Sequence, residues 1–224
     1  MAKTQTPLLW TLLLLSLACL GLGAFALRAE AGASSLGSGS SQLPQFLSMM
    51  DEAPPLPLSV EGQRAWLRNC EVALQAAAPL ALRFASDRQK AAVLPFCANL
   101  AQASVAADKT DAYAWLVLAT TQIRQGEMDA ASQSIVWSAL TGHNESWLAQ
   151  IRFDLVQNNY AALSASAQSA GDADTAILVQ SNRGAAVARQ YVADADFRRR
   201  AEQLIEALPE TVQRRFISLI RRQL

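Results

Sequence analysis

The sequence predicts an all-α protein, in which an N-terminal transmembrane helix precedes antiparallel helix hairpins that stack on one another. Pro7–Leu27 contains 21 residues without a charge, and a helix of that length spans the roughly 30 Å core of a bilayer. The chain is 51% hydrophobic and only 17% charged. It is rich in Ala, Leu, Gln and Ser, and it lacks the alternating β-branched and aromatic residues that strands favour. Short breaks separate the helical segments, so consecutive helices must run antiparallel.

The charges beside the apolar run predict its orientation. Lys3 and the amino terminus precede the run, whereas Arg28 on its far side is offset by Glu30. Positive charge is preferentially retained in the cytoplasm. We therefore expect residues 1–6 to be cytoplasmic, residues 7–27 to cross the membrane once, and the rest of the chain to lie on the other side.

Two other interpretations of the apolar run stay open. Ala24–Ala26 resembles a signal-peptidase site, and cleavage there would release the rest of the chain from the membrane. Cys19 ends a segment that faintly resembles a lipoprotein box, although Ser16 stands where Leu is usual. The uncleaved anchor is favoured because the run is longer than the roughly 7–15 apolar residues of removable signals.

Residues 28–58 are predicted to form a tether. Ala31–Gln42 is dominated by Gly and Ser and has too little apolar content to fold. Three prolines stiffen Asp51–Leu58. Leu43–Met50, between these segments, is apolar enough to pack on the domain or on a partner. The folded domain is expected to occupy residues 59–224.

Proline, glycine and asparagine residues divide this domain into helices. Ser59 is a suitable N-cap for the first helix, and Pro79 stops it. Pro95 predicts an internal kink or a late start of the second helix. We expect helices at about residues 59–78 and 87–107, two between 111 and 144, and further ones at about 145–157, 160–170, 173–192, 195–208 and 210–223.

Gly126 separates the two helices predicted between residues 111 and 144. Trp115 and Leu118 lie on one face of the first helix, the small residue Ala119 follows, and a second small residue, Ala131, comes twelve positions later. Small residues let two helix backbones approach closely, while large ones fill the space against neighbouring helices. This pattern resembles the tetratricopeptide repeat (TPR), a helix hairpin that stacks into a solenoid.

The resemblance covers Ala112 to about Ala170, roughly a quarter of the chain, and it has departures. Gln122 stands where the family usually has an aromatic residue, and His143 where it often has Pro. The next hairpin repeats the pattern more faintly. Its first helix echoes the earlier one at a spacing of 33 residues through Leu148, Ile151 and Leu155.

The TPR resemblance implies a groove that binds protein segments, lined by the first helix of each pair. An anchor, a tether and an extracytoplasmic TPR-like domain together resemble bacterial envelope accessory proteins that serve polysaccharide synthesis and export or secretion. The resemblance therefore implies a scaffold in the inner membrane, whose periplasmic domain binds a protein partner in or at the membrane. The groove-facing positions that it implies are Tyr113, Leu116, Thr120, Ile123, Arg124, Ala149, Phe153, Val156 and Gln157.

Two alternatives to the scaffold remain. One is a subunit held in a membrane complex mainly through its transmembrane helix. The other is a helical enzyme acting on cell-wall glycan. The sequence contains no Gly-rich phosphate loop or nucleophile elbow to mark an enzyme. We therefore predict no enzymatic activity and no cofactor.

The remaining polar residues give little sign of chemistry. The single histidine, His143, excludes multi-histidine metal sites. It follows Gly142 at a helix C-terminus, where we expect it to be exposed or to cap the helix. The formal net charge is zero, which gives no indication of nucleic-acid binding. The tryptophans of the domain are expected to fill gaps between helices: Trp66, Trp115, Trp137 and Trp147.

Cys70 and Cys97 are placed to form a disulfide. They are equidistant from the break predicted between the first two helices of the domain, so they face each other in an antiparallel pair. An envelope location permits oxidation. Two buried free thiols are the alternative, because Cys packs as a small apolar residue.

The C-terminus is basic: nine Arg oppose five acidic residues between Arg183 and Leu224. One interpretation is a terminal capping helix whose Arg face is solvated. The other is a basic surface for anionic lipid or an acidic partner, extended by Phe197–Arg200. On a helical wheel Val212, Phe216, Leu219 and Ile220 form an apolar stripe widened by Ile217 and Leu224, opposite Arg214, Arg215, Arg221 and Arg222.

Overall fold

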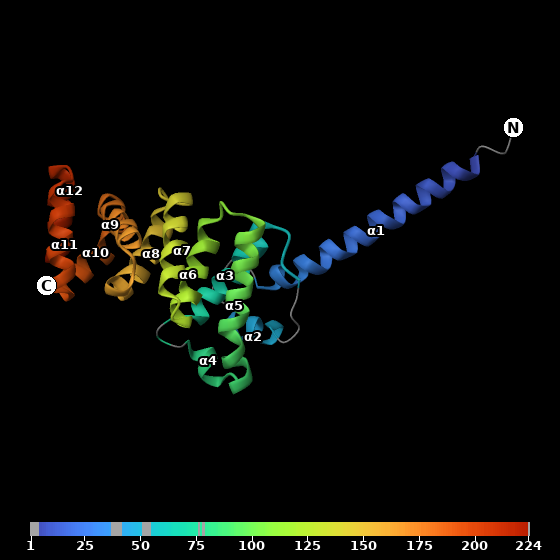
Figure 1. Cartoon of the computed structure of the whole chain (residues 1–224), viewed down its shortest axis with the longest axis horizontal. Coiled ribbons are helices and arrows are strands. Elements are labelled where there is room, and N and C mark those ends of the chain that lie inside the picture. The colour runs from blue at the N-terminus through green and yellow to red at the C-terminus, as the bar shows by residue number, and fades with distance from the viewer. Residues whose placement is uncertain (1–4, 37–41, 51–54, 76, 78, 224) are drawn as a thin grey trace. The chain divides into compact units, whose positions relative to one another are not determined.

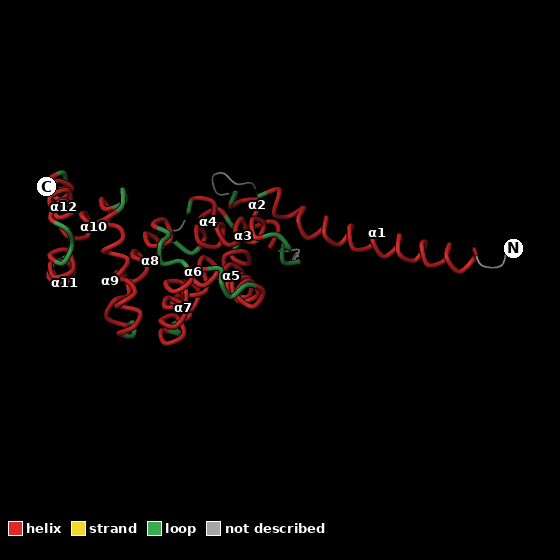
Figure 2. The backbone as a smooth tube through the Cα atoms, turned by 90° about the horizontal axis from the view of Figure 1, so that it is seen from above, coloured by secondary structure: helices red, strands yellow, loops and turns green. Residues whose placement is uncertain are grey.

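The structure is a computed structural model that describes residues 5–36, 42–50, 55–75, 77 and 79–223. Every regular element within these ranges is helical, and they contain no strand (Figures 1 and 2). The predicted all-α class is therefore confirmed. The chain divides into two compact units, an N-terminal unit that ends at Phe96 and a C-terminal unit that begins at Cys97.

Helix α1 (Gln5–Ser35) contains the predicted membrane segment. By length and composition, its stretch Leu9–Ala33 is apolar enough to cross a membrane. The helix does not end at Leu27, where the tether was expected to begin. It continues because Ala29 and Ala33 are only 3% and 4% exposed, so the last turns of α1 are packed against other parts of the protein.

The apolar segment within the expected tether forms α2 (Leu43–Met50), a helix with its apolar face buried. Phe46 lies edge-on to Trp66 and to Phe96, with ring centroids 5.8 Å and 5.6 Å apart. The segment therefore packs on the domain, which was one of the two outcomes expected. Residues 37–41 and 51–54 of the expected tether lie outside the described residues.

The last turns of α1 are joined to the start of α3 (Val60–Ala73) by hydrogen bonds. The backbone N–H of Ser59 donates to Glu30 Oε1 at 2.7 Å, and its hydroxyl donates to Glu30 Oε2 at 2.8 Å. The same hydroxyl accepts from Gly62 N at 3.0 Å, which confirms Ser59 as the N-cap. Gly62 is required there, because a Cβ would lie 2.7 Å from Pro57 Cβ and 2.9 Å from Glu30 Oε2.

Two more helices complete the first part of the domain. Helix α3 ends at Ala73, before Pro79, and the short α4 (Leu80–Phe84), which was not expected, follows. Helix α5 (Asp87–Ala107) has the predicted bounds and contains Pro95 without being interrupted. The predicted disulfide is present and joins Cys70 on α3 to Cys97 on α5.

The C-terminal unit contains helices that follow one another in chain order (Figure 1). Helix α6 packs along α7 and α8 along α9, and α6 also contacts α8 as α7 contacts α9. Gly126 ends α6 in the left-handed conformation, with φ of 82°, as its predicted turn requires. The elements are α6 (Ala112–Gln125), α7 (Met128–Thr141), α8 (Ser146–Asn159), the 3₁₀ turn η1 (Tyr160–Ala162), α9 (Ala165–Gln180), α10 (Gly184–Ala193), α11 (Ala195–Glu206) and α12 (Glu210–Arg221).

The break expected at Gly171-Asp172 is wrong. Gly171 lies inside α9, and the chain breaks instead at Ser181–Arg183. Gly171 is needed for packing and not for a turn, since a Cβ there would lie 2.5 Å from a methyl carbon of Val156. The glycine allows α8 and α9 to approach closely.

Two apolar clusters form the core of the C-terminal unit. The first joins α6 to α9 through the small residues Ala119 and Ala167, with Ile135 and Val156 between them. Ala131 is also fully buried, so both small residues that defined the TPR-like pattern lie at helix contacts. The second cluster joins α8–α12 through Ala149, Phe153, Leu178, Val179, Val187, Ala188, Phe197, Ala201, Ile205 and Phe216.

Candidate membrane anchor and interaction surfaces

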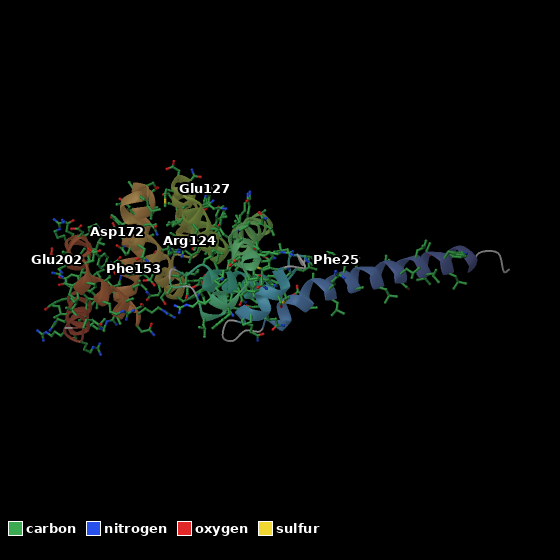
Figure 3. The ribbon with its side chains drawn as sticks, turned by 90° about the horizontal axis from the view of Figure 1, so that it is seen from below. Phe25, Arg124, Glu127, Phe153, Asp172 and Glu202 are labelled. Carbon is green, nitrogen blue, oxygen red and sulfur yellow. The ribbon has the colours of Figure 1, made fainter. Side chains whose placement is uncertain are left out.

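The first candidate site is the apolar surface of α1. Large apolar side chains along it are exposed, from Trp10 at 66% to Phe25 at 54% and Leu27 at 73% (Figure 3). Water does not favour such a surface, whereas a lipid bilayer does. Trp10 lies near one end of the apolar stretch, where indole rings favour the membrane–water interface.

The predicted groove is not an open surface. Tyr113 packs on Trp147, with ring centroids 5.4 Å apart, and Phe153 packs edge-on to Phe197 in the second cluster. The chain's own helices therefore cover positions that the TPR resemblance assigned to a partner. Five of the nine predicted groove positions are buried, so the prediction that they face a partner is wrong for them: Tyr113, Leu116, Ala149, Phe153 and Val156.

The other four groove positions lie at or near the surface. Thr120, Ile123 and Gln157 are half-buried. Arg124 is exposed near the end of α6. These four residues do not form a continuous apolar lining, so they offer little binding energy by themselves.

An exposed apolar surface lies instead on α7, and we call it the Trp137 surface. It consists of Trp137, which is 50% exposed, and Leu140, which is 63% exposed. Trp115 of α6 stacks on Trp137 with ring centroids 5.9 Å apart. The indole N–H of Trp115 donates to the Lys109 carbonyl at 2.9 Å. Sequence patterning assigned these tryptophans to gaps between helices. The spacing of Trp137 and Leu140, three residues apart on one helix face, was the available signal.

A buried polar network ties four helices together. Arg152 is fully buried on α8, and its guanidinium donates to both carboxylate oxygens of Asp174 on α9 at 2.6 Å and 2.7 Å. It also donates to the Ser138 carbonyl and hydroxyl oxygens on α7, both at 3.1 Å. The Ser138 hydroxyl donates to the Ala112 carbonyl of α6 at 2.9 Å. Nothing in the sequence distinguished Arg152 from a surface arginine.

The electrostatics of this network indicate a structural role. Burial raises the pKa of the Asp174 carboxyl to about 6, although the hydrogen bonds and charge of Arg152 act in the opposite direction. Desolvation therefore outweighs the attraction between the two groups. Because the pair is inaccessible and fully engaged, it fixes the register of α6–α9 and has no free group for chemistry.

Helix α12 packs as a capping helix. Phe216 is buried, and Val212, Leu219 and Ile220 pack on the second cluster, as the apolar stripe predicted. Ile217, expected to widen the stripe, is 47% exposed instead, because its position points away from Phe216. Leu224 lies outside the described residues.

The predicted basic face is only partly free. Arg214 pairs with Glu210 at 3.2 Å, and Arg215 donates to the Val179 carbonyl at 2.7 Å. Arg221 and Arg222 are exposed and have no ion pair with any described residue.

The arginines of Phe197–Arg200 are used within the unit. Arg198 donates to the Tyr191 and Val192 carbonyls, and Arg199 pairs with Asp196. Arg200 lies 3.8 Å from the ring centre of Tyr160 and donates to Gln157 Oε1 at 2.9 Å. These contacts leave little of the segment available to extend a basic surface.

The single histidine of the chain is the last polar position that the sequence singled out. His143 is exposed at the end of α7, which is one of its two expected roles. Among the residues that the structure describes, no group of three or more His, Cys, Asp or Glu side chains is placed to hold a metal ion.

No protein-family model, curated protein or solved structure matches the chain.

Proposed function

We propose that the chain is a membrane-anchored, extracytoplasmic, TPR-like scaffold that binds a protein partner in an envelope complex of the polysaccharide synthesis and export or secretion type. The observation that carries the proposal is the exposed apolar surface of α1 on a chain that otherwise folds into helices with buried cores. A protein in water does not keep such a helix exposed. A bilayer is the environment that stabilises it.

The proposed location is a bacterial inner membrane, with the N-terminus in the cytoplasm and the helical domain in the periplasm. The disulfide between Cys70 and Cys97 supports this side of the membrane, because disulfides persist in oxidising compartments. The flanking charges of α1 support the same orientation.

The paired packing of α6 with α7 and of α8 with α9 supports a short solenoid of helix pairs. So does the burial of Ala119 and Ala131 at helix contacts, which the TPR-like pattern predicted. In this proposal the Arg152 network serves to lock successive pairs in one register.

The proposed partner contact is the Trp137 surface and not the predicted groove. Tryptophan is enriched among the few residues that supply most of the energy of typical protein interfaces. Leu140 adds apolar area beside it, which is stabilising when a partner excludes water. The test is extraction of the tagged full-length chain from native membranes in mild detergent, followed by identification of what co-purifies in stoichiometric amounts.

The double variant Trp137→Ala/Leu140→Ala is expected to weaken partner binding by about 2 kcal/mol, or roughly thirtyfold. Gln203→Ala is the matched control, because Gln203 is exposed on α11, which is not one of the helices that pack closely on α7. Equal co-purification with both variants would reject the Trp137 surface as the contact.

A second candidate is a subunit held mainly through α1, favoured by the exposure of its apolar side chains. Replacing residues 7–27 by an unrelated transmembrane segment distinguishes the two functions. The scaffold retains its partner after the exchange, whereas a subunit held through α1 loses it.

A further inference from the structure

We propose that the N-terminal unit makes a second contact with lipid through the Leu58–Val60 corner, defined as Leu58, Ser59 and Val60. The occupant of this corner is the headgroup layer of the same bilayer that α1 crosses. The inference rests on the proposed membrane anchoring and adds to it a fixed height of the N-terminal unit above the membrane.

The position where lipid contact ends on α1 can be read from burial. Leu27 is 73% exposed, whereas Ala29, Ala33 and Leu36 are 3%, 4% and 1% exposed. The stretch from Leu9 to Leu27 is about 28 Å long at 1.5 Å per residue, close to the thickness of a bilayer core. From about Ala29 onwards protein therefore covers one face of α1, while Ala31 on another face stays exposed. The first charged residues after the apolar run, Arg28 and Glu30, mark the same level.

The Leu58–Val60 corner is held at that boundary by Glu30. The Glu30 carboxylate accepts from Ser59 N at 2.7 Å and from Ser59 Oγ at 2.8 Å. Glu30 lies three residues, about 4.5 Å of helical rise, beyond Leu27. Side chains of a helix lean toward its N-terminus, which here means toward the bilayer. The Glu30 carboxylate therefore lies at or below the height of the Glu30 Cα, and it holds the Leu58–Val60 corner there. Figure 1 shows the chain leading to α3, drawn in cyan, beside the last turns of α1.

The headgroup layer has the right depth to contain the corner. It is about 5–7 Å thick on each side of the bilayer core. Leu58 and Val60 flank Ser59 and are 60% and 49% exposed. Two apolar side chains that are exposed in water, at the height of the headgroups, gain stabilisation by entering the acyl boundary.

The corner is too constrained to turn away from the membrane. Pro57 is buried, and its carbonyl accepts from Gln63 Nε2 at 2.9 Å. Ser59 caps α3, and Gly62 lies in close contact with both Pro57 and Glu30. The charged residues at the joint between α1 and α3 and on the first turn of α3 balance, since Arg28 and Arg64 oppose Glu30 and Glu61. The contact should therefore depend little on anionic lipid.

The test uses the full-length chain reconstituted in vesicles of phosphatidylcholine, with and without phosphatidylglycerol. Leu58→Cys in a Cys19→Ser background gives one free thiol for an environment-sensitive fluorophore, because Cys70 and Cys97 are joined. Leu80→Cys in the same background is the matched control. Leu80 is 67% exposed on α4, which lies beyond α2 from α1 in Figures 1 and 2. Native Cys19, exposed on α1, reports the anchor itself.

The expected result has three parts. The label at Cys19 is quenched by lipids with a nitroxide deep in the acyl chain. The label at residue 58 is quenched by lipids with a nitroxide near the headgroup, emits at shorter wavelength than the label at residue 80, and is protected from aqueous iodide. The label at residue 80 is quenched by iodide only. Val60→Cys should repeat the result for residue 58 with an independent substitution.

Two other results would overturn the lipid contact of the corner. One of them leaves the proposed membrane anchoring through α1 intact, and the other overturns it as well. A label at residue 58 that responds to iodide as strongly as the label at residue 80, while Cys19 lies in lipid, rejects the corner and keeps the anchor. A label at Cys19 that is open to iodide rejects the membrane anchoring and the corner with it.

Discussion

The two units hold their helices together by different means. The N-terminal unit packs an aromatic cluster of Phe46, Trp66 and Phe96 and engages the last turns of α1. The C-terminal unit relies on small residues at its helix contacts and on the buried Arg152 network. The first arrangement fixes the apolar helix α1 to the helices that follow it in the same unit. The second locks helix pairs in register and leaves side chains such as Trp137 on the surface.

The largest expected effect concerns the buried network. Arg152→Met leaves Asp174 buried without its partner, and breaking a buried ion pair in this way costs about 3–5 kcal/mol of the free energy of unfolding. The measurement is urea unfolding of the full-length chain in detergent micelles, followed by circular dichroism.

The matched control is the double variant Arg152→Met/Asp174→Leu, which removes both charges. It should be close to wild type in stability, since apolar replacements of a buried pair are often neutral or stabilising. Equal destabilisation by the single and double variants would show that the network contributes packing alone.

The close contact between the last turns of α1 and the start of α3 should be destabilised by a single added methyl group. Gly62→Ala places a Cβ within 3 Å of Pro57, Ser59 and Glu30 atoms, and such overpacking costs about 1–3 kcal/mol. The expected result is a lower unfolding temperature and faster proteolysis near residue 59. Gly21→Ala is the control, because a Cβ there meets nothing within 4 Å; an equal effect of both would contradict the close approach.

A smaller effect is expected at the start of α11 in the C-terminal unit. Asp194 accepts from the backbone N–H groups of Asp196 and Phe197 at 2.9 Å and 3.0 Å. Replacing such an N-cap by Ala costs about 1 kcal/mol. Gln203→Ala, at an exposed position on the same helix, should change stability by less than about 0.5 kcal/mol.

The Asp194 contribution should also depend on pH. The hydrogen bond from Phe197 is the largest cause that lowers the pKa of Asp194. Because the pKa is lowered in the folded state, the stabilisation by Asp194 is fully present when the pH is above the ordinary aspartate pKa of about 3.9. It is lost as the pH falls through the lowered pKa of the folded state. The difference in unfolding free energy between wild type and Asp194→Ala should therefore shrink in acid; a constant difference would contradict the cap.

The sequence predicted those features that depend on local pattern. The helical class, the turn at Gly126, the bounds of α5 and the pairing of Cys70 with Cys97 follow from residue spacing and backbone preference. Gly171 shows the limit, because the same residue type serves as a turn or as a close helix contact. Only the position of Val156 decides between them.

The candidate sites were less predictable, because burial depends on which helices come together. The burial of Phe153 at the expected groove depends on Phe197, some forty residues later in the chain. Arg152 looked like a surface residue, since its partner Asp174 lies on a different helix. The end of α1 was misplaced because the Gly and Ser content after Leu27 concealed two buried alanines.

The most direct test of the central claim is the side of the membrane on which the helical domain lies. Gln203→Cys in the Cys19→Ser background places one free thiol on an exposed position of α11, away from the proposed partner contact on α7. The protein is then treated with a membrane-impermeant maleimide in intact spheroplasts, before and after lysis. Full labelling before lysis, with the protein in the membrane fraction, is the predicted result. Labelling only after lysis would place the domain in the cytoplasm and contradict the account.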